Sequence, residues 1–203
     1  MSPDSPTQLI DRFDRRISYL RLAVTDRCDF RCQYCMAETM DFLHRPEVLT
    51  IEELLRTARL FTELGVRKIR VTGGEPLIRR GVHELFEGLG ALAGLDSLAL
   101  TTNGSQLADS GHALRNAGVN SINISLDSLQ AERFKAITRI GDLNTVLRGI
   151  DRAVECGFDR IRLNAVILDG LNRDEVLPLT HYALAKSIHC LLYTSDAADE
   201  GLG

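Results

Sequence analysis

Residues 20–35 read Leu-Arg-Leu-Ala-Val-Thr-Asp-Arg-Cys-Asp-Phe-Arg-Cys-Gln-Tyr-Cys, a short strand-like apolar segment followed at once by three cysteines. Cys28, Cys32 and Cys35 have no further cysteine close by, and the next histidine is His44. A structural zinc site normally closes with four ligands, so this run is one ligand short. Three thiolates on a four-iron cluster leave one iron free to bind a small molecule. The missing fourth ligand therefore favours an iron–sulfur cluster.

The cysteine run is also compatible with a zinc knuckle or with buried, inert thiols. A zinc knuckle would need a remote ligand, and the two remaining cysteines are weak candidates. Cys156 stands at the expected end of an amphipathic helix, where a small core residue is usual, and Cys190 lies in the C-terminal tail. A disulfide is disfavoured because the count of five is odd and no N-terminal apolar segment suggests secretion.

The composition excludes several classes of partner. The 203 residues suffice for one domain with a core, and the 44% hydrophobic and 26% charged residues are typical of a globular protein. A net charge of −4 does not favour a nucleic-acid-binding face, and no apolar run approaches the length of a membrane span. Unpaired cysteines without an export signal predict a protein of the reducing cytoplasm. We therefore expect neither nucleic acid nor a membrane as a partner.

Strand-like and helix-like segments alternate along the chain. The predicted strands are 20–25, 68–72, 97–101, 121–126 and 160–168. The predicted helices lie between Thr50, which forms a capping box with Glu53, and Gly65, and at 82–92, 107–117, 131–137, 143–155 and 176–185. This alternation predicts a parallel sheet with right-handed crossovers. A barrel or partial barrel fits the pattern, and an open doubly wound sheet remains an alternative.

Polar motifs follow the predicted strands at their C-terminal ends, where ligands gather in parallel α/β folds. They are Thr-Asp-Arg at 25–27, Thr-Gly-Gly-Glu-Pro at 72–76, Thr-Thr-Asn-Gly at 101–104 and Ser-Leu-Asp-Ser at 125–128, with Arg162 and Asn164 on the fifth strand. Each motif alone can be purely structural, because Gly-Gly and Asn-Gly are common turn pairs and a serine can cap a helix. Their shared position predicts a site at this rim.

These motifs resemble those of a known family. The three-cysteine run with an aromatic residue before its last cysteine, followed by Gly-Gly-Glu-Pro after the second strand, resembles radical S-adenosylmethionine (radical SAM) enzymes. Further segments resemble the GTP 3′,8-cyclase family, which catalyses the first step of molybdenum cofactor biosynthesis. These segments begin at Arg21, Ile69, Leu100, Asn123 and Arg162. The resemblance runs from about Phe13 to Ala185.

The resemblance implies an α/β fold, a partial (βα)6 TIM-like barrel of the radical SAM type that is incomplete at strand six. Cys28, Cys32 and Cys35 would ligate a 4Fe-4S cluster, whose open iron would chelate the amino and carboxylate groups of S-adenosyl-L-methionine. The positions implied to contact S-adenosyl-L-methionine are Tyr34, Gly74, Glu75 and Ser125. Of these, Glu75 would help to fix the amino group.

The resemblance also implies a GTP site on the opposite side of the rim. Its implied residues are Arg21, Arg70, Thr101 and Arg162. Arginine suits this work because its planar fork pairs with two phosphate oxygens at once. The family usually carries lysine at position 162, so the chain keeps the charge there and changes the geometry. The role of Thr101 could instead belong to Thr102.

The implied activity is that of a radical SAM lyase. It converts GTP to (8S)-3′,8-cyclo-7,8-dihydroguanosine 5′-triphosphate: a 5′-deoxyadenosyl radical takes a hydrogen from the ribose 3′ carbon, and the new bond forms to guanine C8. A reducing electron donor is the implied partner, and a homodimer is compatible with it. Two alternatives stay open, namely another radical SAM enzyme that matures a peptide or cofactor, and a zinc-binding structural protein.

The chain departs from the family at its C-terminal end. A complete member carries a second three-cysteine cluster that binds the guanine, and no second cysteine set is present in this sequence. The segment from Cys190 onward resembles a translated sequencing-library adapter. We therefore expect a flexible lead-in at 1–16, a truncated radical SAM barrel at 17–189 and a non-native tail at 190–203 that adds nothing to the fold. The fifth strand would then present an unpaired edge, and the fragment would be inactive.

Overall fold

A single parallel sheet organises the chain. The computed structural model describes residues 8–37 and 39–194. The strands of the sheet are β1 (Tyr19–Ala23), β2 (Lys68–Thr72), β3 (Ser97–Thr102), β4 (Val119–Ser125), β5 (Arg160–Ile167) and β6 (His189–Thr194). They lie side by side in sequence order, and every neighbouring pair is parallel. A doubly wound sheet would reverse its strand order, so that alternative is excluded and the partial barrel is confirmed.

Helices connect successive strands. They are α1 (Ile51–Glu63), α2 (Val82–Gly90), α3 (Leu107–Asn116), α4 (Ala131–Thr138), α5 (Leu143–Glu155) and α6 (Val176–Ala185), with short 3-10 turns η1 (Arg45–Glu47), η2 (Pro76–Ile78) and η3 (Arg173–Glu175). The capping box is confirmed, because Glu53 N–H donates to the Thr50 hydroxyl at 3.2 Å and the Glu53 carboxylate accepts from Thr50 N–H at 2.7 Å. Gly65 leaves the helical path at φ +97°, as predicted for the stop after α1.

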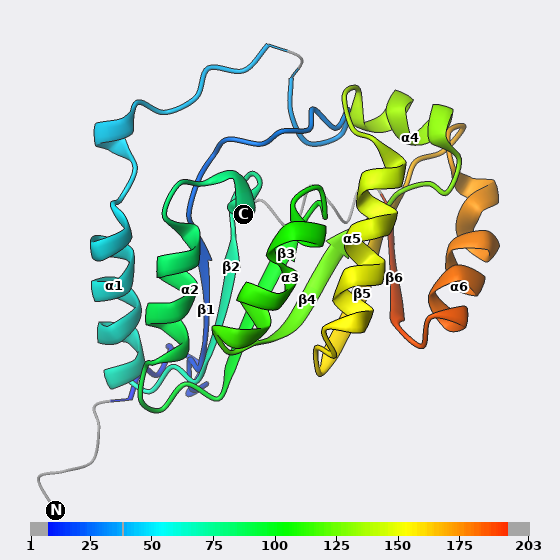
Figure 1. Ribbon diagram of the computed structural model, residues 1–203. Coiled ribbons are helices and arrows are strands. Elements are labelled where there is room, and N and C mark those ends of the chain that lie inside the picture. Colours follow the sequence, from blue (N-terminus) through cyan, green and yellow to red (C-terminus); the bar gives the residue numbers. More distant parts are fainter. Residues whose placement is uncertain (1–7, 38, 195–203) are drawn as a thin grey trace, which may run out of the picture.

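The two faces of the sheet have different chemistry. Ile69 and Val71 on β2, and Ile122 and Ile124 on β4, are fully buried in the core against the helices. Side chains alternate between faces along a strand, so the residues between these core positions point to the opposite face, which we call the inner wall. Figure 1 shows α2, α3 and α5 in front of the sheet, with α1 and α6 at its two ends. The inner wall is therefore the face away from these helices.

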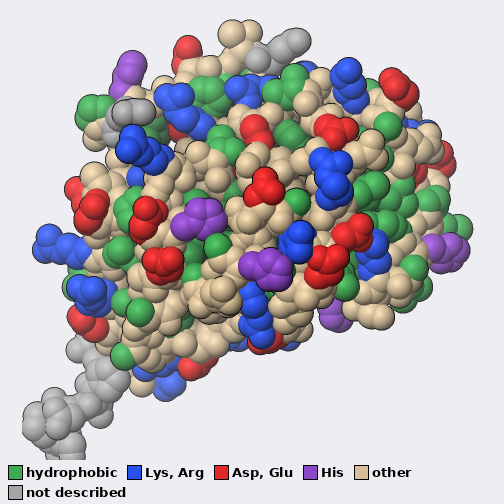
Figure 2. All heavy atoms as spheres, viewed as in Figure 1, with side chains coloured by type: hydrophobic (Ala, Val, Ile, Leu, Met, Phe, Trp, Pro, Cys, Tyr) green, Lys and Arg blue, Asp and Glu red, His purple; other side chains and the backbone are tan. Residues whose placement is uncertain are grey.

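The exterior over the helices mixes both signs of charge. Figure 2 shows acidic and basic side chains interspersed across this face, without a broad area of one sign. Mixed surface charge of this kind is usual for a globular protein and points to no particular ligand. None of the helices in the described ranges combines the length and the apolar character needed to span a bilayer.

The sixth strand corrects the prediction for the C-terminal segment. Residues 189–194 form β6 and pair with β5 in six register positions, from Arg162 opposite His189 to Ile167 opposite Thr194. The expectations that residues from Cys190 onward add nothing to the fold, and that β5 presents an unpaired edge, are wrong for 190–194. The reason is local composition, since Cys-Leu-Leu-Tyr-Thr is rich in β-forming side chains and Cys190 packs against the core. The rest of the predicted tail, 195–203, lies outside the described residues.

The N-terminal segment also differs from its prediction. Leu9 N–H donates to Leu64 O at 3.3 Å, and Ile17 N–H donates to Leu9 O at 2.9 Å. An antiparallel bridge joins Ile10 and Arg16. Residues 9–17 are thus hydrogen-bonded to the end of α1 and to each other, unlike the flexible lead-in expected for 1–16. Residues 1–7 of that lead-in lie outside the described residues.

Candidate functional site

The three clustered cysteines share one loop after β1. Cys35 N–H and Met36 N–H both donate to Cys32 O at 3.0 Å, which makes a tight turn. Arg31 N–H and Gln33 N–H donate to carbonyl oxygens at the end of α4, each at 3.0 Å. Cys28 and Cys32 are half-buried, whereas Cys35 is exposed. The cysteine loop (residues 24–36) is therefore held against the barrel with its last thiol facing outward.

Burial controls the protonation of these thiols. It raises the pKa of Cys28 to about 11 and of Cys32 to about 12, and it raises the pKa of Cys35. Smaller contributions to the raised pKa of Cys32 come from the charges of Asp127, Cys28 and Cys35. Without a metal they are neutral thiols at pH 7, so a metal that binds them must displace protons.

The three thiols of the cysteine loop are suitable ligands for an iron–sulfur cluster. Within the described residues, no three His, Cys, Asp or Glu side chains converge tightly enough to hold one metal ion. A zinc ion requires such convergence on one point. A 4Fe-4S cluster does not, because each thiolate binds a different iron atom. Three thiols on one short, anchored loop therefore suit a cluster.

Gly73 and Gly74 bring the loop after β2 against the cysteine loop. A side-chain carbon at Gly74 would lie 2.2 Å from Arg27 O, and one at Gly73 would lie 2.4 Å from Thr25 O. Two backbone hydrogen bonds hold the loops together. Gly74 N–H donates to Thr25 O at 2.6 Å, and Glu75 N–H donates to Arg27 O at 2.8 Å. The glycine pair thus packs two backbones together, a role that its turn-like sequence did not reveal.

Glu75 joins the loops after β2 and β3. It is fully buried and accepts hydrogen bonds from Leu77 N–H at 3.0 Å, from the Thr102 hydroxyl at 2.8 Å and from Asn103 N–H at 2.6 Å. Burial raises the pKa of Glu75 to about 7, and the three donors partly oppose this rise. The side chain therefore fixes the relative position of two loops at the rim.

Asp29, to which no sequence motif gave a role, ties the cysteine loop to the loop after β3. Its carboxylate accepts from Asn103 Nδ2 and from the Ser105 hydroxyl, each at 2.6 Å. Asn103 Nδ2 also lies 3.8 Å from Cys28 Sγ, and Phe30 N–H donates to the same sulfur at 3.3 Å. Donors around Cys28 favour its thiolate form. The Asn-Gly motif was visible in the sequence, but its partner in the cysteine run was not.

Tyr34 is fixed by a second buried carboxylate. Its hydroxyl donates to Asp127 Oδ2 at 2.8 Å, while Asp127 Oδ1 accepts from Val166 N–H at 2.8 Å. Asn172 Nδ2 donates to Asp127 O at 2.7 Å, which links the loops after β4 and β5. Burial raises the pKa of Asp127 to about 6 and also raises the pKa of Tyr34. Ser125, two residues before Asp127, lies at the end of β4 opposite Asn164.

The four residues predicted to bind GTP share the inner wall. Arg21 and Arg70 are opposite each other in register on β1 and β2. Arg70 donates to the Thr101 hydroxyl at 3.3 Å and to the Tyr19 hydroxyl at 2.9 Å. Thr101 is in turn opposite Asn123 on β4, which is opposite Arg162 on β5.

Two further observations concern the charge of Arg162 on the inner wall and the choice between Thr101 and Thr102. Burial lowers the pKa of Arg162, and the positive charges of Arg160 and Arg70 lower it further. Arg70 and Arg162 come from strands that are not neighbours, and both lie on the inner wall. Thr102 points the other way, is buried, and donates to Glu75. Thr101 is therefore the threonine of the inner wall.

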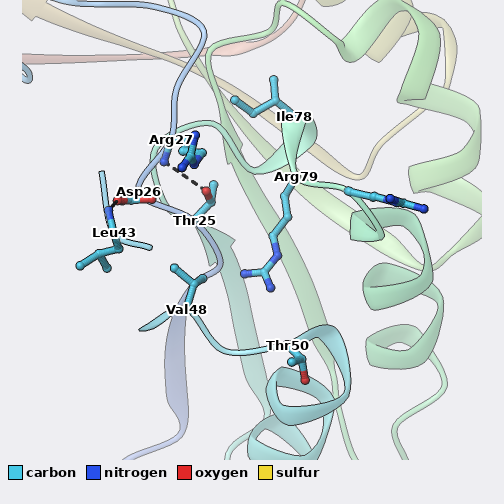
Figure 3. Close-up of a pocket in the computed structure, with 9 residues that line it drawn as sticks. Thr25, Asp26, Arg27, Leu43, Val48, Thr50, Ile78 and Arg79 are labelled. Atoms are coloured by element: carbon cyan, nitrogen blue, oxygen red, sulfur yellow. Dashed lines mark hydrogen bonds between the residues drawn. The ribbon is translucent and has the colours of Figure 1, made fainter. Parts of the chain in front are cut away.

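A cavity lies on the outer side of the cysteine loop. It measures about 500 Å³, and its lining residues are Thr25, Asp26, Arg27, Leu43, Val48, Thr50, Ile78, Arg79 and Arg80. Figure 3 shows Arg79 extending from its loop toward Val48 and Thr50. The Arg79 guanidinium donates to the carbonyl oxygens of Val24 and Leu49, so it bridges two segments. Thr25, Asp26 and Arg27 of the first rim motif line this cavity, but none of the residues implied to bind the cluster, S-adenosyl-L-methionine or GTP does, and its arginine bridge is structural.

The fold and the cysteine loop define a class of protein. Residues 22–183 match the radical SAM superfamily. The chain therefore belongs to the radical SAM superfamily.

Curated relatives are similar to this chain over most of its length. The GTP 3′,8-cyclase 2 of Pseudomonas aeruginosa is 56% identical over 184 residues, which cover 91% of this chain and 56% of the relative. The GTP 3′,8-cyclase of Saccharophagus degradans is 55% identical over 180 residues, which cover 89% of this chain and 54% of the relative. The chain thus spans about half the length of the curated relatives it matches.

Solved structures share the fold at low identity. Streptococcus suis SuiB bound to S-adenosylmethionine superposes with a TM-score of 0.71 at 17% identity, over 88% of this chain and 39% of that one. The enzyme anSMEcpe with bound AdoMet superposes with a TM-score of 0.66 at 16% identity, over 87% of this chain and 49% of that one. At these identities the similarity establishes the fold alone.

Proposed function

We propose that the chain is the cluster- and nucleotide-binding part of a GTP 3′,8-cyclase, a radical SAM lyase of molybdenum cofactor biosynthesis. The reaction converts GTP to (8S)-3′,8-cyclo-7,8-dihydroguanosine 5′-triphosphate. The observation that carries the proposal is the inner wall, where Arg21, Arg70, Thr101 and Arg162 lie on one face of the sheet and Arg70 donates to the Thr101 hydroxyl. Curated relatives that are 55–56% identical bear the same enzyme name.

The cysteine loop would hold the catalytic cofactor. Cys28, Cys32 and Cys35 would each bind one iron of a 4Fe-4S cluster and leave one iron open. When bound, the cluster would supply one electron to S-adenosyl-L-methionine and so provide the radical chemistry that the reaction at the ribose requires. The chain itself holds the thiols in place through Asp29 and through the end of α4, and half-buries two of them.

Tyr34, Gly74, Glu75 and Ser125 remain the proposed residues for S-adenosyl-L-methionine, with a restriction from their contacts. The Tyr34 hydroxyl is already donated to Asp127, so Tyr34 would meet the cofactor through its backbone or ring. The Glu75 carboxylate already accepts three hydrogen bonds. A carboxylate has about four acceptor positions, so one is unused, but the fully buried side chain must become accessible before the cofactor amino group can reach it.

Arg21, Arg70, Thr101 and Arg162 are the proposed residues for GTP. Guanidinium groups that repel one another in the free protein gain the most from a shared anion. Burial, and after it the charges of Arg160 and Arg70, lower the pKa of Arg162, and a triphosphate bound beside this side chain would favour its charged form. A peptide offers single carboxylates, whereas a triphosphate concentrates several negative charges in one group, so this cationic wall favours a nucleotide over the alternative of peptide maturation.

The five cysteines bear on how many clusters the chain binds. All five are free. Cys156 lies 3.5 Å from His112, and Cys190 packs against the core, so neither is placed to complete a second cluster of the family type. We propose that this chain binds one cluster, receives its electron from a reducing donor and works in the cytoplasm; a homodimer remains compatible with the proposal.

Nucleotide binding tests the proposal. The chain is reconstituted anaerobically with iron and sulfide, and GTP affinity is measured by calorimetry. Hydrogen bonds to charged groups contribute about 1.5–3 kcal/mol each, so Arg162→Ala should weaken GTP binding by about tenfold or more. Arg173→Ala is the matched control, because that arginine is exposed on the 3-10 turn η3, outside the sheet, with a loose ion pair of 3.7 Å to Asp169. Unchanged GTP affinity in Arg162→Ala would refute the assignment.

A further inference from the structure

Three buried polar atoms on the inner wall lack hydrogen-bond partners among the residues that the structure describes. They are Ser121 Oγ, Asn123 Oδ1 and Asn164 Oδ1. Buried polar atoms in folded proteins are nearly always paired, and exceptions mark places that a ligand, an ion or water completes. Ser121 and Asn123 are 7% and 9% exposed, so bulk solvent does not satisfy them. All three lie on β4 and β5, facing the barrel interior.

The three unpaired atoms lie in successive rows along the strands. Ser121 is opposite Arg160, Asn123 stands between Thr101 and Arg162, and Asn164 is opposite Ser125. Successive rows are two residues apart, so the three rows cover about 13 Å along the strands. The lower rows are cationic, and the top row is nearest the C-terminal strand ends that carry the cysteine loop.

The unpaired oxygen atoms accept hydrogen bonds, whereas the arginine side chains only donate them. Arginine side chains only donate hydrogen bonds, which suits phosphate oxygens. The Thr101 hydroxyl oxygen already accepts one hydrogen bond, from Arg70, and can still donate to a phosphate oxygen. Asn123 Oδ1 and Asn164 Oδ1 are acceptors, so they call for a donor on the ligand. The triphosphate of a nucleotide carries almost no protons at pH 7, but its ribose hydroxyls can donate.

We propose that Asn123 and Asn164 bind the ribose hydroxyl groups of the nucleotide and select a ribonucleotide over its deoxy analogues. The inference rests on the proposed function and deepens it. Asn123 adjoins the phosphate-binding row through Arg162, and Asn164 adjoins the cofactor row through Ser125. The ribose would thus lie between the triphosphate and the cysteine loop, where its 3′ carbon must be for the reaction.

Paired changes in the protein and the ligand test this assignment. The cluster-loaded chain is titrated by calorimetry with GTP, 2′-deoxy-GTP and 3′-deoxy-GTP. One neutral hydrogen bond changes affinity by roughly three- to tenfold, so wild-type protein should prefer GTP by that factor over at least one deoxy analogue. Asn123→Ala and Asn164→Ala should each lose GTP affinity by that factor and bind the analogue that lacks the partner hydroxyl as wild type does.

Asn120→Ala is the matched control on the same strand. The Asn120 carboxamide is already paired, with Ser97 Oγ at 3.1 Å and with Asp96 O at 3.4 Å, near the opposite end of β4. Its replacement should leave GTP affinity unchanged. The melting temperature of the free protein gives an independent readout. Asn123→Ala removes an unsatisfied buried atom, so it should melt no lower than wild type, whereas Asn120→Ala loses two hydrogen bonds and should melt lower.

The outcomes separate the two proposals. Wild-type affinity for GTP in both Asn123→Ala and Asn164→Ala would overturn the ribose assignment, because water alone would then satisfy these atoms. Equal weakening for GTP and both deoxy analogues would overturn it as well, since the contact would be to another part of the ligand. Failure of the proposed function looks different: the wild-type chain would not bind GTP, or Arg162→Ala would not weaken it. The titrations of wild-type protein with the deoxy analogues need no variant, so a folding defect cannot mask the result.

Discussion

Gly74 shows how one missing side chain shapes the site. Its backbone lies so close to the cysteine loop that a methyl group would come within 2.2 Å of Arg27 O. The two backbones are also hydrogen-bonded, so neither can move away without losing those bonds. The position of the cysteine loop therefore depends on the lack of a side chain at Gly74.

Gly74→Ala should therefore destabilise the chain by about 3 kcal/mol or more, because overpacking against backbone cannot relax easily. Gly157→Ala is the control, since Gly157 has positive φ but nothing within 4 Å of the added carbon, and it should cost about 1 kcal/mol. Urea unfolding measures both values. Equal costs in the two variants would show that the contact with Arg27 does not matter.

Glu75 makes a prediction about pH. Its folded pKa is raised to about 7 by burial, above the value of 4.5 for an exposed glutamate. Between pH 4.5 and 7 the folded state therefore holds a proton that the unfolded state has released. The free energy of unfolding should fall as pH rises through this window, with a slope of up to about 1.4 kcal/mol per pH unit from this group.

Glu75→Gln should remove that part of the slope. Urea unfolding of the cluster-free chain at several pH values measures it, and Glu87→Gln, at an exposed position on α2, is the control. An unchanged slope in Glu75→Gln would mean that Glu75 is ionised in the folded protein throughout the window.

At the scale of elements, β6 stabilises the sheet by covering the edge of β5. It pairs with β5 along six residues, and its Cys190 packs against the core. Without β6, the backbone groups of β5 would face water at an open edge, which lowers stability and invites association.

Deleting residues 190–203 should lower the melting temperature by about 4 °C or more, since 1 kcal/mol corresponds to roughly 2–4 °C in a chain of this size. A variant that stops after Thr194 is the comparison, because it keeps β6. The difference between the two melting temperatures isolates the strand. If both variants melt together, β6 does not stabilise the sheet.

At the scale of the whole molecule, several elements of the fold hold the cysteine loop in place. The loop is held by Asp29 to the loop after β3, by Tyr34 to Asp127 after β4, and by backbone bonds to the end of α4. A cluster on these thiols would bind the folded state and not the unfolded one, so it should stabilise the entire fold.

Anaerobic reconstitution should therefore add about four irons per chain and raise the melting temperature, and a chelator should reverse both changes. Cys32→Ala should abolish iron binding and the thermal shift. Cys156→Ala should keep both, because Cys156 lies away from the loop beside His112. Tight binding of one zinc ion, with no iron retained, would contradict the cluster assignment.

Local patterns in the sequence accounted for the elements. The alternation of strands and helices, the Thr50–Glu53 capping box and the stop at Gly65 follow from contacts between residues a few positions apart, so they could be predicted. Cysteine spacing predicted one loop with three thiols for the same reason. The sixth strand was not predicted because its segment resembles an adapter translation, yet its β-forming side chains and the neighbouring edge of β5 were sufficient to build it.

Only the tertiary structure decided which loops meet. Asp29 and Asn103 are 74 residues apart and Tyr34 and Asp127 are 93 apart, yet each pair shares one hydrogen bond. The sequence shows these residue types but not their partners, because the partners follow from strand order and register across the whole sheet. The same holds for Asn123, which has ordinary neighbours along the chain. Its unpaired oxygen became visible once β3 and β5 set Thr101 and Arg162 on either side of it.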